Sequence, residues 1–214
     1  MNDTALLEDA LRAYLNRRCR RAYAHDLRNG LQGIFGGVDA LTRAARAVKP
    51  MAVPLEQVTQ FVQQAIGNHE RGLERVLESM APEQLAPETL AIRELLTELA
   101  RFLTNDAARH NVRVRLDFSD DIKVTVQVAR LRLICLGLLA ESIDSMPSGG
   151  ELRIAGRTVD GRAQFELVDT RTQPRPVTFV SEAIERVVAA LSGRIETQQK
   201  PAGGYQARVE LPAS

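Results

Sequence analysis

The sequence predicts an α+β protein in which an N-terminal helical hairpin is followed by a C-terminal α/β sandwich. Residues 4–47 contain no proline and are rich in Ala, Leu and Arg, which favours a long helix. Apolar residues recur in this stretch at the spacing of a helical-bundle seam. Further along the chain, "VRVRLDF" and "RAQFELVD" alternate apolar and polar residues, as half-buried strands do.

The hairpin is predicted from two apolar seams separated by a proline-containing break. "KPMAVP" at 49–54 ends the first helix, and a second helix is expected over 55–80. Because a lone hairpin cannot bury both faces, we expect two copies to form a dimeric four-helix bundle over residues 1–82. The first seam consists of Leu27, Leu31, Ile34, Val38, Leu41 and Ala45. The second consists of Val58, Val62, Ala65, His69, Leu73, Val76 and Met80.

The second domain, 83–214, follows the linker "APEQLAPE" at 81–88. We expect a mixed α/β layer with a largely antiparallel sheet. The expected helices are 90–109, 129–146 and 180–192. The expected strands are 112–118, 122–128, 151–158, 162–169, 192–199 and 205–212.

Composition excludes several classes of function. Apolar residues make up 44% of the 214 residues, yet no apolar run reaches the roughly 18 residues that a membrane span needs. The net charge of +1 argues against binding of nucleic acid by the whole chain. Cys19 and Cys135 lie too far apart for a metal-ligand spacing. The start "MNDTALLEDALRAYL" lacks the pattern of a signal peptide, so we expect a cytoplasmic protein. The sequence contains no metal-ligand cluster and no dinucleotide fingerprint, so we expect the chain itself to bind no metal or cofactor.

The candidate site is "AYAHDLRNGLQG" at 22–33. His25 precedes Leu27 by two residues, so at about 100° per residue it points away from the seam, and Asn29 follows one turn later on the same side. A carboxylate such as Asp26 can orient an imidazole and raise its nucleophilicity. We therefore select His25, Asp26 and Asn29 as catalytic candidates. The partner-binding candidates near the same face are Arg18, Arg21, Arg28 and Gln32.

Four glycines follow this histidine inside the helix: Gly30, Gly33, Gly36 and Gly37. Each costs about 0.8–1 kcal/mol relative to alanine in a helix interior, so a compensating role is expected. One interpretation is close approach of a partner's backbone, or a bend beneath the histidine. The other is tight packing between the bundle's own helices. His69, on the second seam, is interpreted as a hydrogen-bonded core histidine.

The stretch His25-Asp26-Leu27-Arg28-Asn29 resembles the H-box of sensor histidine kinases, which lies on the first helix of a dimeric hairpin. "LRLICLGLLAESIDSMPSGGELRI" at 131–154 is similar to the N-box segment of their ATP-binding domain. The resemblance covers residues 10–210 and implies that domain 83–214 has the kinase-type ATP-binding fold.

The chain departs from the family where the nucleotide would bind. Glu141 and Gly137 stand at the two asparagine positions of the N-box, and Glu141 takes the magnesium-binding one. The D-x-G-x-G box reads Asp169-Thr170-Arg171-Thr172-Gln173, so its aspartate remains and both glycines are lost. Only "RPVTFV" precedes the next helix, without a glycine-rich phosphate loop.

The resemblance therefore implies a phosphorelay histidine phosphotransferase that does not bind ATP. It would pass phosphate through His25 between the aspartates of response-regulator receiver domains, with a hybrid histidine kinase as a further candidate partner, and the receiver would supply Mg²⁺. Two alternatives stay open: a divergent histidine kinase that uses ATP, and a non-catalytic pseudokinase that docks regulators.

Overall fold

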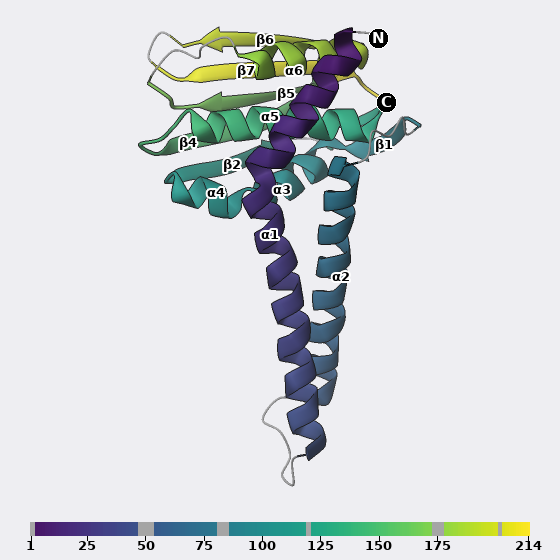
Figure 1. Ribbon diagram of the computed structural model, residues 1–214. Helices are drawn as coiled ribbons and strands as arrows, with labels where there is room; N and C mark the ends of the chain where they lie inside the picture. Colours follow the sequence, from purple (N-terminus) through teal and green to yellow (C-terminus); the bar gives the residue numbers. More distant parts are fainter. Residues whose placement is uncertain (1–2, 47–53, 81–85, 119–120, 173–177, 201–202) are drawn as a thin grey trace. The chain divides into compact units, whose positions relative to one another are not determined.

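The computed structural model describes residues 3–46, 54–80, 86–118, 121–172, 178–200 and 203–214, without the side chains of Asp26 and of residues 74–80. Contacts divide the chain into a helical unit, Arg18–Ala81, and an α/β unit, Met1–Arg17 with Pro82–Ser214. The predicted fold class is confirmed, since long N-terminal helices precede a helix-covered five-stranded sheet (Figure 1). None of the described helices is both long enough and apolar enough to cross a bilayer.

Helix α1 (Asp3–Arg46) contacts helix α2 (Leu55–Met80) within the helical unit through a row of glycines. A Cβ atom added at Gly30 would lie 2.8 Å from His69 Nδ1, and one at Gly37 would overlap Val62 Cγ2. A Cβ atom at Gly33 would lie 3.0 Å from Ala65 Cβ. Packing between the hairpin's own helices therefore explains three of the four glycines, while Gly36 faces open space.

The predicted apolar seam of α1 does not form this contact. Leu31 and Val38 are 42% and 48% exposed in the single chain, and Leu73 on α2 is 42% exposed. The glycine row turns toward α2, which leaves the apolar seam on another side of α1. An exposed apolar surface of this kind is typical of a protein–protein interface.

The adjacent glycines Gly36 and Gly37 provide a matched test of the helix contact. Gly37→Ala should lower the free energy of unfolding by about 1–2 kcal/mol, because overpacking outweighs the gain in helix propensity. Gly36→Ala should raise it by about 0.8–1 kcal/mol, because its Cβ meets no neighbour. Urea unfolding followed by circular dichroism measures both. Equal effects of the two substitutions would contradict the described packing.

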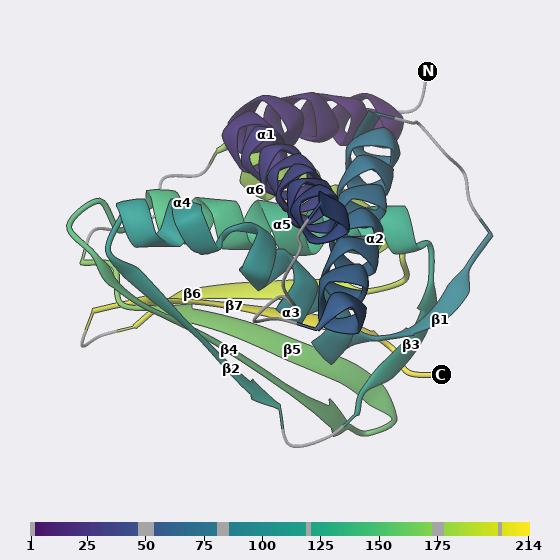
Figure 2. The same ribbon diagram turned by 90° about the horizontal axis from the view of Figure 1, so that it is seen from below.

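The α/β unit contains a five-stranded sheet in the order β2-β4-β5-β7-β6. Helices α3 (Ile92–Phe102), α5 (Val128–Asp144) and α6 (Phe179–Ala190) cover one face (Figure 2). Alternate strand residues, such as Ile154, Phe165 and Val209, are fully buried beneath them. The strands are β2 (Val112–Phe118), β4 (Gly150–Val159), β5 (Arg162–Asp169), β6 (Arg194–Gln199) and β7 (Tyr205–Pro212).

Two details differ from the sequence prediction. The expected helix 90–109 is interrupted: strand β1 (Glu88–Ala91) precedes α3, and α4 (Thr104–Arg109) follows it after Leu103. The expected strand 122–128 shortens to β3 (Lys123–Val126), which pairs with β1 outside the main sheet. The sheet is antiparallel except for the parallel pair β2–β4. β1 forms because it pairs with β3, which is distant in sequence. A prediction from local propensity does not include that pairing, and it favoured a helix at these residues.

The first residues of α1 belong to the α/β unit, whereas the domain prediction assigned the whole helix to the hairpin. Leu11 and Leu15 are 0% and 1% exposed, and the ring of Tyr14 meets that of Phe179 edge to face at 5.4 Å. Arg130 Nε donates to Glu8 Oε2 at 3.0 Å, which ties α1 to α5. The segment therefore packs on α5 and α6 as part of their core.

Leu15→Ala should destabilise the α/β unit by about 2–5 kcal/mol, because it opens a cavity in a fully buried site. Leu6→Ala, at a position that is 54% exposed on the same helix, should change the free energy of unfolding by less than about 0.5 kcal/mol. Thermal unfolding of the full chain measures both. A Leu15→Ala variant as stable as the wild type would show that this segment does not pack on the α/β unit.

Candidate functional site

His25 and Asn29 form a hydrogen-bonded pair on α1. The Asn29 amide nitrogen lies 3.0 Å from His25 Nδ1 and 3.5 Å from Nε2, in an exposed position. The i,i+4 spacing predicted this proximity, because residues four apart face each other on a helix. The side chain of Asp26 lies outside the described part of the chain, so its predicted role in orienting the ring stays a prediction. Asn29 is one partner of the ring in the described part of the chain.

The predicted partner-binding residues lie on the solvent side of α1. Arg21, Arg28 and Gln32 are exposed, and Arg18 is partly exposed. Their long side chains can therefore reach a docked protein, and their charge favours an acidic one. Their role in binding stays a prediction.

A groove of about 360 Å³ lies between α1 and α2 beside Asn29. Phe61 is 53% exposed at this groove, and Arg71 donates to Asn68 Oδ1 at 2.7 Å. The lining comprises Asn29, Gly30, Gly33, Phe61, Gln64, Ala65, Asn68 and Arg71. The sequence analysis missed the α2 contribution, although Phe61, Gln64, Asn68 and Arg71 recur at helical spacing and mark one face of that helix.

His69 differs from its prediction. Its Nδ1 atom is buried and has no hydrogen-bond partner among the described residues. The ring instead packs against Gly30, one residue after Asn29. The predicted position on the helix contact is therefore right, while the hydrogen bond expected of a core histidine is absent at Nδ1.

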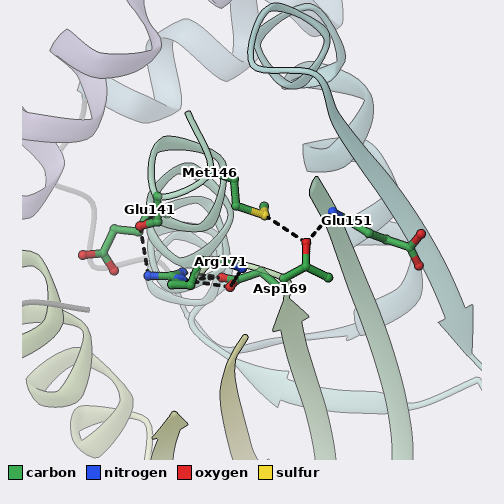
Figure 3. A network of polar contacts seen from close by, with 7 residues as sticks. Glu141, Met146, Glu151, Asp169 and Arg171 are labelled. Carbon is green, nitrogen blue, oxygen red and sulfur yellow. Dashed lines mark hydrogen bonds and ion pairs between the residues drawn. The ribbon is translucent and has the colours of Figure 1, made fainter. Parts of the chain in front are cut away.

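A second cluster surrounds Asp169, the retained aspartate at the end of β5 (Figure 3). Asp169 and Arg171 are buried, with 2% and 3% of their surfaces exposed, and form an ion pair. Arg171 Nε lies 2.8 Å from Asp169 Oδ1 and 3.0 Å from Oδ2. The guanidinium also donates to Ser145 Oγ at 2.9 Å and stacks over Tyr205 at 4.5 Å.

The Glu141 carboxylate accepts a hydrogen bond within the α/β unit. Thr178 Oγ1 donates to Glu141 Oε1 at 3.0 Å and accepts from the Ser181 backbone N–H at 3.3 Å. Thr178 is the N-cap residue of α6, so the carboxylate holds the start of that helix.

The ion pair with Arg171 determines which groups the Asp169 carboxylate contacts in this structure. In the histidine kinases that the sequence resembles, the aspartate of the D-x-G-x-G box meets the adenine amine, and in this chain Arg171 holds its carboxylate in a buried position. Within the described residues, no group of three or more His, Cys, Asp or Glu side chains is arranged to hold a metal ion. Residues 173–177, where the phosphate loop was sought in the sequence, lie outside the described part.

Comparisons with known proteins identify the fold. No protein-family model matches the chain. Sporulation kinase D of Bacillus subtilis (strain 168) is 22% identical over 210 residues, which cover 89% of this chain and 40% of that protein. This chain thus spans less than half of that relative's length.

Solved histidine kinase structures resemble the chain at low sequence identity. The catalytic domain of histidine kinase ThkA has a TM-score of 0.55 at 13% identity, covering 60% of this chain and 96% of that one. Histidine kinase AdeS of Acinetobacter baumannii has a TM-score of 0.54 at 14% identity, covering 88% and 97%. Full-length ShkA, solved with AMPPNP, has a TM-score of 0.54 at 18% identity, covering 99% and 46%. The chain therefore has a histidine-kinase-like fold.

Proposed function

We propose that the protein transfers phosphate in a two-component signalling system through His25, without binding ATP. The observation that carries this proposal is the buried Arg171–Asp169 ion pair, which engages the carboxylate that an adenine amine would otherwise contact in the proposed scheme. The exposed contact of His25 with Asn29 supports a phosphoryl-accepting role for the hairpin.

The proposed step is an in-line transfer from a receiver aspartate. The bond between the aspartyl oxygen and phosphorus breaks, a bond from phosphorus to an imidazole nitrogen of His25 forms, and the aspartate leaves as a carboxylate. The proton on the opposite ring nitrogen passes to Asp26 or to water. Mg²⁺ held by the receiver offsets the charge of the transferring group.

Asn29 biases the tautomer of His25 in this proposal. With its amide nitrogen toward Nδ1, that ring nitrogen is the acceptor and Nε2 carries the proton. When the amide rotates by half a turn, Oδ1 accepts from Nδ1–H and the lone pair resides on Nε2. Nε2 is then the attacking nitrogen. Asn29 therefore favours one tautomer of the ring, while the attack itself needs only the lone pair of the neutral imidazole.

The groove beside Asn29 is the proposed docking site for the receiver domain. Phe61 supplies an exposed apolar contact, and Arg71 adds a cation on α2. Arg18, Arg21 and Arg28 on α1 complement the acidic pocket in which a receiver binds Mg²⁺.

The exposed apolar seam of α1 supports a homodimer. Ile34→Glu should break the dimer, because it places a charge between Leu31 and Val38 on the seam. Light scattering should then give 23.6 kDa, where the wild type gives twice that mass. Gln57→Glu, an exposed change on α2, is the matched control and should leave the dimer intact. A monomeric wild type at micromolar concentration would contradict the proposed bundle.

His25→Ala should abolish acid-labile labelling when the protein is mixed with a phosphorylated cognate receiver. Asn29→Ala should retain most of the labelling and slow the loss of receiver phosphate, because an amide one turn from the histidine can position water. The assay follows both phosphoproteins over time. If Asn29→Ala abolishes the loss of phosphate from the receiver while His25→Ala keeps part of that loss, the protein is chiefly a phosphatase. A label that remains in His25→Ala, at His69 or His110, would show that another histidine carries the phosphate.

The second candidate is a histidine kinase that uses ATP. The fold shared with ShkA, which was solved with AMPPNP, and the similarity to sporulation kinase D favour it. In that case Arg171 would have to leave Asp169 when the nucleotide binds. Calorimetry with ATP and Mg²⁺ separates the two candidates: a micromolar dissociation constant selects the kinase.

A further inference from the structure

The carboxylate of Asp169 is enclosed by donors from a single residue two positions away. Arg171 Nε reaches both carboxylate oxygens, Nη2 donates to Oδ2, and the backbone N–H of Arg171 reaches Oδ1 at 3.2 Å. The two side chains are 2% and 1% exposed. Two parallel N–H donors from a planar guanidinium are the strongest complement that a carboxylate finds in proteins.

Other groups complete a recess around the guanidinium. Ser145 Oγ accepts from Nη1 at 2.9 Å and donates to the Glu141 carbonyl at 2.7 Å, so the hydroxyl is fixed at the end of α5. The ring of Tyr205 lies against the guanidinium plane at 4.5 Å. The recess therefore offers the carboxylate edge of Asp169, the hydroxyl of Ser145 and the aromatic face of Tyr205 to a flat group with several N–H donors.

The backbone of Arg171 is fixed as well. The Gly204 N–H donates to the Arg171 carbonyl at 2.8 Å. Gly204 has φ +96°, and a Cβ atom there would lie 2.6 Å from the Asp169 carbonyl oxygen. Glycine thus permits the close approach of the β7 end to residues 169–171.

We propose that Arg171 is an internal ligand that occupies a binding site for planar N–H-donor cations, and that a guanidinium from solution takes this site when the Arg171 side chain is removed. This proposal rests on the part of the proposed function that excludes ATP. It does not depend on phosphate transfer through His25. Methylguanidinium matches the vacated space in planarity, charge and donor geometry.

The test uses the Arg171→Gly variant of the full chain. Its melting temperature should fall below that of the wild type, because a buried carboxylate loses its partner. Millimolar methylguanidinium should raise it again, by a shift that grows with the logarithm of concentration once the dissociation constant is exceeded. Tetramethylammonium at equal concentration has the charge without N–H donors and should give no rescue. The wild type should respond to neither cation.

Two matched variants separate the recess from ordinary ion-pair effects. Arg153→Gly removes an arginine from an exposed pair with Asp117 on the same sheet, at side-chain exposures of 56% and 61%, and should show no rescue. Asp169→Asn combined with Arg171→Gly keeps the space but lacks the carboxylate, and should also show none. Equal rescue in either variant, or none in Arg171→Gly, would overturn the proposal.

A measurement on the wild type covers the case in which Arg171→Gly does not fold. The Arg171 Nε–H resonance should exchange slowly with solvent and should not move when ATP and Mg²⁺ are added. Fast exchange, or a shift on ATP addition, would overturn the internal-ligand assignment. If the Arg171 tests fail while a receiver still labels His25, only this inference is wrong. If methylguanidinium restores the melting temperature of Arg171→Gly while a receiver does not label His25, only the proposed transfer function is wrong.

Discussion

The close contact of α1 with α2 along Gly30, Gly33 and Gly37 is the constraint on which the helical unit depends. Side chains there would collide with His69, Ala65 and Val62. Because the glycine row points to α2, the rotation of α1 about its axis is fixed. The apolar seam and the His25–Asn29 pair then take up separate faces of the helix. The same contact leaves a groove beside Asn29 into which α2 contributes Phe61 and Arg71.

Two acidic residues of the α/β unit bind partners within the same chain. Glu141 holds the N-cap of α6 through Thr178, and Asp169 is neutralised by Arg171. Both acidic residues stabilise the unit through partners in the same chain. The docked start of α1 adds Leu11, Leu15 and the Glu8–Arg130 pair to this core. Structural stability therefore accounts for these contacts without any nucleotide.

The sequence predicted the features that depend on local periodicity. Both long helices, most strands and the proximity of His25 and Asn29 follow from spacing along the chain. It did not predict β1, which pairs with β3 across more than thirty residues, or the packing of Leu15 on α5 and α6. The sequence showed that arginine replaces the glycine of the box at position 171. It did not predict the ion pair with Asp169, because the orientation of the Arg171 side chain depends on its contacts with Ser145 and Tyr205. The groove residues of α2 were not predicted either, because polar residues on one face of a helix do not indicate which other helix packs beside that face.

The central claim is that phosphate reaches His25 from a receiver and not from ATP. The most direct measurement supplies the two donors separately to the same protein: radiolabelled ATP with Mg²⁺ in one reaction, and a purified, labelled receiver phosphoaspartate in the other. The account predicts an acid-labile, base-stable label on His25 from the receiver alone. Labelling of His25 from ATP in the absence of any receiver would contradict it.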